Sequence, residues 1–170
     1  MISFTGSTGV GHKIAQLTAT SMKKVSLELG GKNAAIIFND ANLDDSVAGV
    51  TRSAFLNQGE ICLCTSRIFV QSGIYDEFLK KFIESVKKLK VGDPLAEDTF
   101  TGAVNSAVHY DKVMSYIALA NEDGGIIECG EGVTELNLPP HNKAGYFIQP
   151  TVISGLNDNS RYVVTILACS

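Results

Sequence analysis

Cys62 and Glu28 are the two side chains of this 170-residue sequence whose surroundings favour covalent chemistry. Cys62 follows the turn-forming stretch Asn57-Gln58-Gly59, and Glu28 stands just before the paired glycines Gly30-Gly31. A thiolate can attack the carbon of an aldehyde, and a carboxylate can activate the water that releases the resulting thioester. The oxidation between these two steps requires a hydride acceptor such as a nicotinamide. We therefore predict an enzyme with Cys62 as nucleophile and Glu28 as general base.

Each of these residues also has a structural interpretation. Free cysteines are among the most buried side chains, so Cys62 could be a small hydrophobic residue of the core. Glu28 lies between apolar neighbours and could be an ion-pair member or a solvent-facing strand residue. The loop position of Cys62 and the glycine pair after Glu28 favour function. We interpret the other cysteines, Cys64, Cys129 and Cys169, as packing residues.

The first elements are predicted as strand, glycine-rich turn and helix. Residues 2–4 are apolar and run into the glycine-rich stretch 5–11, after which Val10, Ile14 and Leu17 recur at helical spacing. The backbone N–H groups at such a helix start could hold a pyrophosphate. The glycines do not follow the usual G-x-G-x-x-G order, so a helix start capped by Ser7 or Thr8 is an equally good interpretation.

The remaining elements alternate between strands and helices. Strands are predicted at 25–29, 34–38, 67–70, 126–129 and 146–153, and helices at 43–59, 75–89 and around 113–120, with an exposed loop at 136–142. Asn42 and the acidic residues around it offer a cap and first-turn charges for the first of these helices. This pattern predicts an α/β fold in which a mostly parallel sheet has helices on both faces. Glu28 then lies at a strand end, and Cys62 lies on the loop between a helix and a strand.

Composition narrows the class of partner. The net charge is -4, from 14 basic and 18 acidic residues without long blocks of one sign, which excludes an obvious nucleic-acid or anionic membrane surface. The longest late apolar stretch, 162–169, is too short to span a bilayer, and the start lacks a secretory signal. We expect a soluble, cytoplasmic protein with free thiols and a small-molecule substrate. His12, His109 and His141 are predicted to be surface residues, and no metal site is expected.

Four motifs in this order resemble those of the NAD(P)-dependent aldehyde dehydrogenases. They are Phe4-Thr5-Gly6-Ser7-Thr8, Leu27-Glu28-Leu29-Gly30-Gly31-Lys32, the run from Phe55 to Cys62, and Gly145-Tyr146-Phe147 with Pro150-Thr151-Val152. The longer string from Gly59 to Gln71, with Cys129-Gly130-Glu131-Gly132-Val133, resembles family 8 of these enzymes. The resemblance covers about the first 160 residues.

The resemblance implies a role for each matching position. It makes Cys62 the nucleophile and Glu28 the general base, places Gly6 and Ser7 near the cofactor pyrophosphate, and places Leu29 and Gly30 beside the nicotinamide. The implied reaction is oxidation of an aldehyde, of a muconic semialdehyde type, to a carboxylate in tryptophan catabolism. The implied cofactor is NAD, with NADP as the alternative.

The resemblance also implies a domain organisation. Residues 1–30 correspond to the C-terminal part of an NAD-binding domain, residues 31–160 to most of a catalytic domain of the aldehyde dehydrogenase type, and residues 161–170 to a divergent tail. Members of the family are much longer, so we expect an incomplete fold and a truncated chain. The segments that hold the adenosine, an asparagine that binds the oxyanion and the oligomerisation segment have no counterpart in the sequence.

Three functional hypotheses follow. The first is an aldehyde dehydrogenase that keeps its catalytic residues but binds NAD weakly or is inactive. The second is a non-catalytic interaction module that self-associates or pairs with full-length subunits through open sheet edges. The third is a cofactor-free thiol esterase that uses Cys62 and Glu28.

Overall fold

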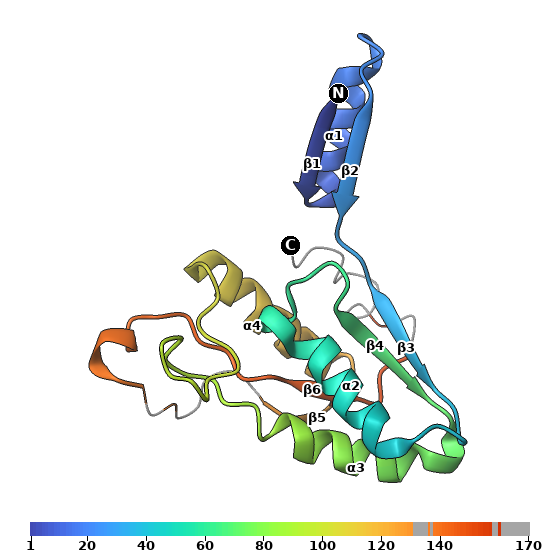
Figure 1. Ribbon diagram of the computed structural model, residues 1–170, viewed down its shortest axis with the longest axis vertical. Helices are drawn as coiled ribbons and strands as arrows, with labels where there is room; N and C mark the ends of the chain where they lie inside the picture. The colour runs from blue at the N-terminus through green and yellow to red at the C-terminus, as the bar shows by residue number, and fades with distance from the viewer. Residues whose placement is uncertain (131–135, 137, 158–159, 161–170) are drawn as a thin grey trace.

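The computed structural model describes residues 1–130, 136, 138–157 and 160. The strands of these residues pair as three two-stranded sheets, two of them parallel and one antiparallel. Figure 1 shows the first two strands and the first helix as a unit that projects from a larger body. The predicted tail, 161–170, which includes Cys169, lies outside the described residues.

The projecting unit is a parallel βαβ arrangement. Strand β1 (Ile2–Gly6) leads into helix α1 (Thr8–Ala19), and β2 (Val25–Leu29) returns beside β1. The Ser7 side chain accepts a hydrogen bond from the Val10 N–H at 3.4 Å and is the N-cap of α1. A serine oxygen at this position satisfies a donor that the first helical turn leaves open. The predicted cap is confirmed.

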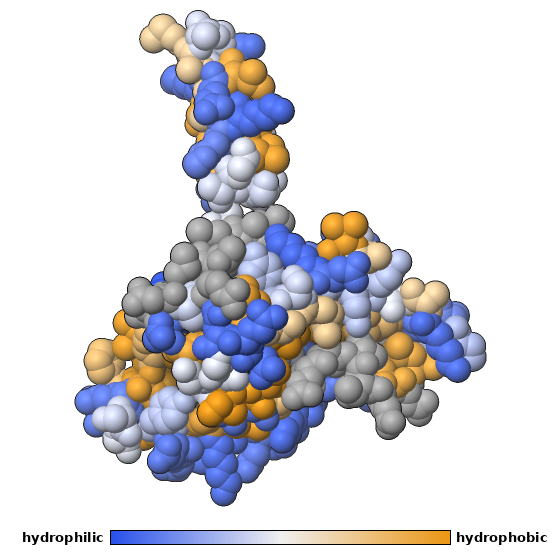
Figure 2. Space-filling view, turned by 180° about the vertical axis from the view of Figure 1, so that it is seen from behind, coloured by the Kyte–Doolittle hydropathy of each residue, from blue (hydrophilic) through white to orange (hydrophobic). Residues whose placement is uncertain are grey.

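The apolar residues Val10 and Leu17, which recur at helical spacing in α1, are largely exposed. Val10 is 46% exposed and Leu17 is 70% exposed. The helix instead approaches β2 through Gly11, where an added Cβ would lie 2.7 Å from a methyl carbon of Leu29. Because glycine has no side chain, the helix lies close to the strand at Gly11. Val10 and Leu17 therefore face outward. Figure 2 shows apolar residues at the surface of this unit.

The body is built on a second parallel pair with two helices. Strand β3 (Asn33–Ile37) pairs with β4 (Thr65–Val70). Helix α2 (Leu43–Phe55) connects the two strands, and the 3-10 helix η2 (Ser72–Ile74) and helix α3 (Tyr75–Val86) follow β4. The Asn42 side chain accepts a hydrogen bond from the Asp45 N–H at 3.3 Å, so the predicted start of α2 is confirmed.

The hydrophobic core lies between this sheet and its helices. Phe82 of α3 is 2% exposed and its ring stacks on Phe55 and on Phe78, with centroids 6.3 Å and 5.6 Å away. The periodic spacing of apolar residues in α2 and α3 drives this packing, because each helix turns one stripe toward its neighbour. The buried cluster consists of Ile37, Val47, Val50, Phe78, Phe82, Val86 and Val152.

The last sheet is antiparallel. It joins β5 (Ile126–Cys129) to β6 (Val152–Ser154) and follows helix α4 (Ala107–Glu122). The predicted strand at 146–153 was too long, since β6 begins only at Val152. Pro150 has no N–H to donate to a ladder, and Tyr146 forms an isolated bridge with Val104 instead. Within the predicted loop at 136–142, the 3-10 helix η3 (Pro140–Asn142) is the one described element, and residue 137 is not described.

These elements confirm the α/β class and its mainly parallel pairing. The β3–β4 pair is covered by helices on one face, while Ile36 and Phe38 at its end are 63% and 61% exposed. Strand β3 therefore buries only one face. Over the part of the chain that the structure describes, no helix is long and apolar enough to cross a membrane.

Candidate active site

The loop that carries Cys62 begins with a tight left-handed turn. After α2 the chain enters the 3-10 helix η1 (Leu56–Gly59), where Asn57, Gln58 and Gly59 have φ angles of 50°, 59° and 77°. Glycine adopts this conformation without strain, but each of the other two residues costs about 1 kcal/mol. The turn redirects the chain so that Cys62 lies on a loop before β4, as predicted.

Asn33 fastens this loop to the start of β3. Its Nδ2 donates to the carbonyl oxygen of Cys62 at 2.6 Å and lies 3.4 Å from the carbonyl oxygen of Cys64. A Cβ placed on Gly31 would lie 3.5 Å from the same Cys62 oxygen, so the glycine pair passes close to the loop. Arg67 of β4 holds this connection by donating twice to the Lys32 carbonyl, at 3.2 Å and 3.0 Å. The Cys62 backbone is thus fixed from the neighbouring strand.

Replacing Asn33 with alanine is expected to loosen this loop. The loss of a side-chain hydrogen bond to the Cys62 carbonyl should lower the free energy of unfolding by about 1–2 kcal/mol. Reaction of Cys62 with an activated ester should slow about tenfold, because a misplaced nucleophile loses its orientation. Urea denaturation and the rate of ester acylation measure the two effects. Asn121→Ala, at an exposed position near the end of α4, is the control, and equal rates in both variants would contradict the role of Asn33.

The three described thiols have different environments. Cys62 is exposed, Cys64 is 8% exposed and Cys129 is half-buried. The turn from Ile61 to Cys64, closed by a backbone hydrogen bond of 2.8 Å, directs the two neighbouring thiols differently. Burial raises the pKa of the Cys64 thiol, with a smaller rise from Cys62, and burial likewise raises the pKa of Cys129. Cys64 is a packing residue, as the sequence predicted.

A limiting thiol reagent should therefore label Cys62 first. Alkylation requires the thiolate, and a raised pKa leaves Cys64 and Cys129 with less thiolate at any given pH. Near neutral pH we expect Cys62 to react at least about tenfold faster than Cys64, and labelling of Cys64 should still rise above the ordinary thiol pKa of about 8.5. Peptide mass spectrometry after iodoacetamide treatment measures each rate. Preferential labelling of Cys64 or Cys129 at neutral pH would overturn the assignment of the nucleophile.

A cavity of about 520 Å³ opens beside the Cys62 loop. Its walls come from the end of α2, the loop, β4, α3, α4 and residues 148–156. Two of the predicted site residues, Cys62 and Gly30, line it, whereas Glu28, Leu29, Gly6 and Ser7 do not. The structure therefore brings Gly30 to the nucleophile and leaves the other four on the projecting unit.

The position of Glu28 follows from its strand. Glu28 is exposed on β2, opposite Thr5 of β1, and β2 is joined to the body only through Gly30, Gly31 and Lys32. Among the described residues, no hydrogen bond or ion pair joins Glu28 to Cys62. The role of Glu28 as general base stays a prediction.

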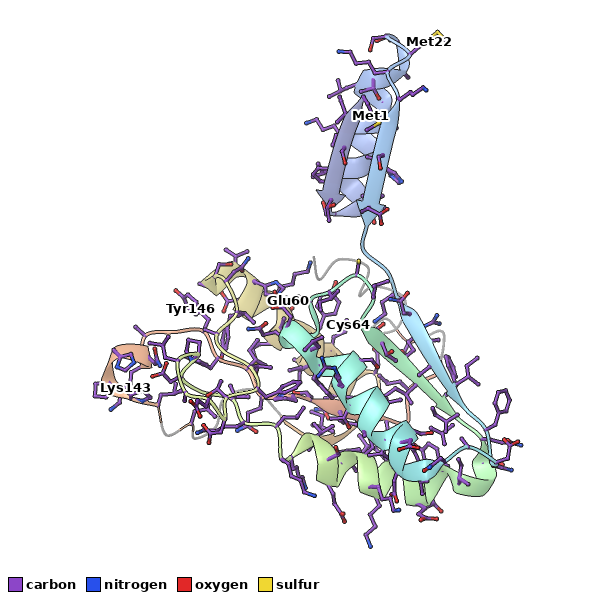
Figure 3. The ribbon with its side chains drawn as sticks, viewed as in Figure 1. Met1, Met22, Glu60, Cys64, Lys143 and Tyr146 are labelled. Carbon is purple, nitrogen blue, oxygen red and sulfur yellow. The ribbon has the colours of Figure 1, made fainter. Side chains whose placement is uncertain are left out.

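Glu60 and His109 are polar residues of the cavity that the sequence analysis did not single out as functional. His109 Nε2 lies 2.9 Å from Glu60 Oε1, and the two side chains are only 18% and 28% exposed. The prediction that His109 is a surface residue was wrong. Ser106 caps α4 and accepts from the His109 N–H at 3.2 Å, which places the imidazole in the first turn beside the loop. Figure 3 labels Glu60 and Cys64 on the segment between α2 and β4.

The other two histidines, His12 and His141, are also of interest because the sequence analysis expected no metal site. His141 is exposed and contacts Asp93 at 3.1 Å, and His12 is exposed on α1. Within the described ranges, no three side chains among histidine, cysteine, aspartate and glutamate gather where they could hold a metal ion.

The chain was compared with known protein families and structures. A model of the aldehyde dehydrogenase family matches residues 1–165. The chain belongs to this family. Among curated aldehyde dehydrogenases, it is 56% identical over 161 residues to 2-aminomuconic semialdehyde dehydrogenase of Mus musculus, which covers 95% of this chain and 33% of that protein. It is 42% identical over 162 residues to 2-aminomuconic 6-semialdehyde dehydrogenase of Pseudomonas sp, with the same two coverages.

A solved aldehyde dehydrogenase has the same fold over this region. The structure of betaine aldehyde dehydrogenase from Staphylococcus aureus in complex with NAD+ superposes with a TM-score of 0.88 at 36% identity, covering 95% of this chain and 31% of the other. The chain spans about a third of the length of these aldehyde dehydrogenases. The predicted family and the predicted fold class are both confirmed.

Proposed function

We propose that this chain carries the nucleophile of an aldehyde dehydrogenase that oxidises a semialdehyde to a carboxylate. The observation that carries the proposal is the setting of Cys62, the exposed thiol among those described, on a strained loop that Asn33 holds beside a cavity of about 520 Å³. The names of the family and of the relatives support the reaction class.

In this proposal Cys62 is the nucleophile and Glu28 is the general base. The Cys62 thiolate forms a bond to the aldehyde carbon, and the resulting oxyanion is held by backbone N–H donors of the loop. Loss of a hydride to the bound dinucleotide would leave a thioester on Cys62. Glu28 then takes a proton from the water that attacks the thioester, and the carboxylate product leaves as the thiol is restored.

The start of α1 fits the pyrophosphate of a dinucleotide. Gly9 in its first turn has no atom within 4 Å of an added Cβ, so a ligand can approach the backbone N–H groups there, next to Gly6 and Ser7. Leu29 and Gly30 would line the nicotinamide, in keeping with the resemblance. When bound, NAD or NADP supplies the hydride acceptor. We propose residues 1–30 as the cofactor-binding part and residues 31–160 as the catalytic part.

The proposed substrate is an aminomuconic semialdehyde, because the relatives at 56% and 42% identity are named for it. We also propose a role in tryptophan catabolism, which the same resemblance implies, and a cytoplasmic location, which the sequence features favour. The test is NADH formation with 2-aminomuconic semialdehyde and with betaine aldehyde under equal conditions. Faster turnover of the semialdehyde supports the proposal, and faster turnover of betaine aldehyde contradicts the substrate.

We predict that this chain by itself binds NAD weakly. The exposed apolar residues Val10 and Leu17 leave α1 packed on one side only, so the pyrophosphate site is poorly preorganised. The dissociation constant should be about 1 mM or higher. Isothermal titration with NAD measures it, with AMP as a control for adenosine contacts alone. Micromolar binding together with turnover would contradict this prediction.

Exposed apolar residues on both the projecting unit and the body favour a second candidate function, association with another protein. Val10, Leu17, Ile36 and Phe38 are each at least 46% exposed, and covering them would remove apolar area from water. The proposed partner is another copy of this chain or a full-length aldehyde dehydrogenase subunit. Co-purification with such a subunit supports this candidate, and a strictly monomeric chain that binds none contradicts it.

A further inference from the structure

The turn before Cys62 is tied twice to the segment that begins α4. Gln58 Nε2 donates to the Ala103 carbonyl at 3.3 Å, and Glu60 Oε1 lies 2.9 Å from His109 Nε2. These two contacts are made by the residues on either side of Gly59, which has the largest φ angle of the turn. A turn with successive left-handed residues persists only where its surroundings over-determine it. The segment 103–109 supplies that restraint.

The contact at Glu60 brings a buried carboxylate oxygen within 2.9 Å of an imidazole nitrogen. Glu60 Oε1 is buried, and His109 Nε2 at 2.9 Å is the polar atom that faces it among the described residues. Burying a carboxylate oxygen without a polar partner costs free energy, so without such a partner the Glu60 side chain would be more stable in contact with water. Contact with His109 therefore keeps Glu60 pointing at α4 and keeps the backbone of residues 59–61 in place.

We propose that His109 is a positioning residue for Cys62. It holds Glu60, and Glu60 holds the turn from which Cys62 projects two residues later. The proposal rests on the assignment of Cys62 as the nucleophile. Glu60, Cys62 and His109 line the same cavity, so a displaced Glu60 would also bring an uncompensated negative charge toward the thiolate. Both consequences slow the reaction of the thiol.

The test measures the alkylation rate of Cys62 relative to that of Cys129 in the same molecule. Iodoacetamide and peptide mass spectrometry are used near neutral pH, without aldehyde or cofactor. In His109→Leu the relative rate should fall about fivefold or more, because the loop loses its restraint and the thiolate is disfavoured. In His109→Gln, which keeps an N–H donor of similar reach, it should stay within about twofold of the unchanged protein.

Two further variants make the test specific. His141→Leu is the matched control, since His141 also contacts a carboxylate, Asp93 at 3.1 Å, but stands apart from the Cys62 cavity. Its relative rate should not change. Glu60→Leu should also slow Cys62, but less than His109→Leu because it removes the negative charge together with the contact. The double variant should be no slower than His109→Leu, as expected for residues that act through one contact.

Three results would overturn the proposal: an unchanged relative rate in His109→Leu, an equal loss in His141→Leu, or additive losses in the double variant. If His109→Leu labels Cys64 as fast as Cys62, the variant has unfolded, and His109→Asn decides instead. Asparagine stays polar but is too short to reach Glu60, so it should also slow Cys62, and an unchanged rate would refute the role of His109. A slow Cys62 in the unchanged protein would count against the proposed function while leaving the ratios between variants measurable.

Discussion

Replacing Cys62 with serine is expected to abolish acyl transfer to this chain. Serine has almost the size of cysteine, but its hydroxyl is a weak nucleophile without a neighbouring base, and no described contact places a base on it. The rate of acylation by an activated ester should fall by at least about a thousandfold. Intact-mass spectrometry after incubation with p-nitrophenyl acetate measures the acyl adduct directly and needs no cofactor.

The control for this experiment is Cys64→Ala. Cys64 is buried, with its Sγ 3.5 Å from the Leu56 carbonyl, so its removal should leave the acyl adduct on Cys62. Ester hydrolysis that continues in Cys62→Ser would place the nucleophile elsewhere and would also remove the thiol esterase hypothesis. Acylation of Cys62 without hydrolysis would instead indicate that the general base does not reach the thioester in this chain.

Replacing Phe82 with alanine is expected to cause the largest loss of stability. Its ring is 2% exposed and stacks between α2 and α3 on Phe55 and Phe78. Removing a buried phenylalanine ring leaves a cavity that the surroundings fill only in part, which costs about 3–5 kcal/mol. Urea denaturation followed by circular dichroism measures the change in the free energy of unfolding.

Phe38→Ala is the matched control for Phe82→Ala. Phe38 is 61% exposed, so its truncation should change the free energy of unfolding by less than about 1 kcal/mol. A similar loss in both variants would show that Phe38 is covered in solution, as the proposed association with another protein requires. A small loss in Phe82→Ala would contradict the packing of α2 on α3.

Elements with a strong apolar period were predictable. The spacing in α2 and α3, the cap at Asn42 and the short strand β5 agree with the structure to within a few residues, because local periodicity and capping decide them. The predicted strand at 146–153 failed because Pro150 cannot donate and the ladder partner of Tyr146 is Val104, far away in the sequence. Pairing between distant segments leaves no periodic signal in either of them.

The residue types of the site could also be predicted from the sequence, but the residues that contact them in the fold could not. Cys62 lies on the predicted loop, and Cys64 is buried as predicted. Asn33, which holds the Cys62 carbonyl, lies 29 positions away, and His109 is farther still from Glu60. A capped helix start at Ser106 and a glutamate two residues before Cys62 were visible signals, but nothing local indicates that they meet.

The order of residues alone determined the family, the α/β class and the placing of a thiol on a turn, because motifs and periodicity are local properties of the chain. Only the tertiary structure decided that α1 turns Val10 and Leu17 outward, that Glu28 stands apart from the Cys62 cavity, and that His109 meets Glu60. The physical reason is that burial and electrostatic partnership depend on which distant segments come together. The sequence of a segment indicates which of its side chains can be buried or can bind, and the tertiary structure determines which other segment they contact.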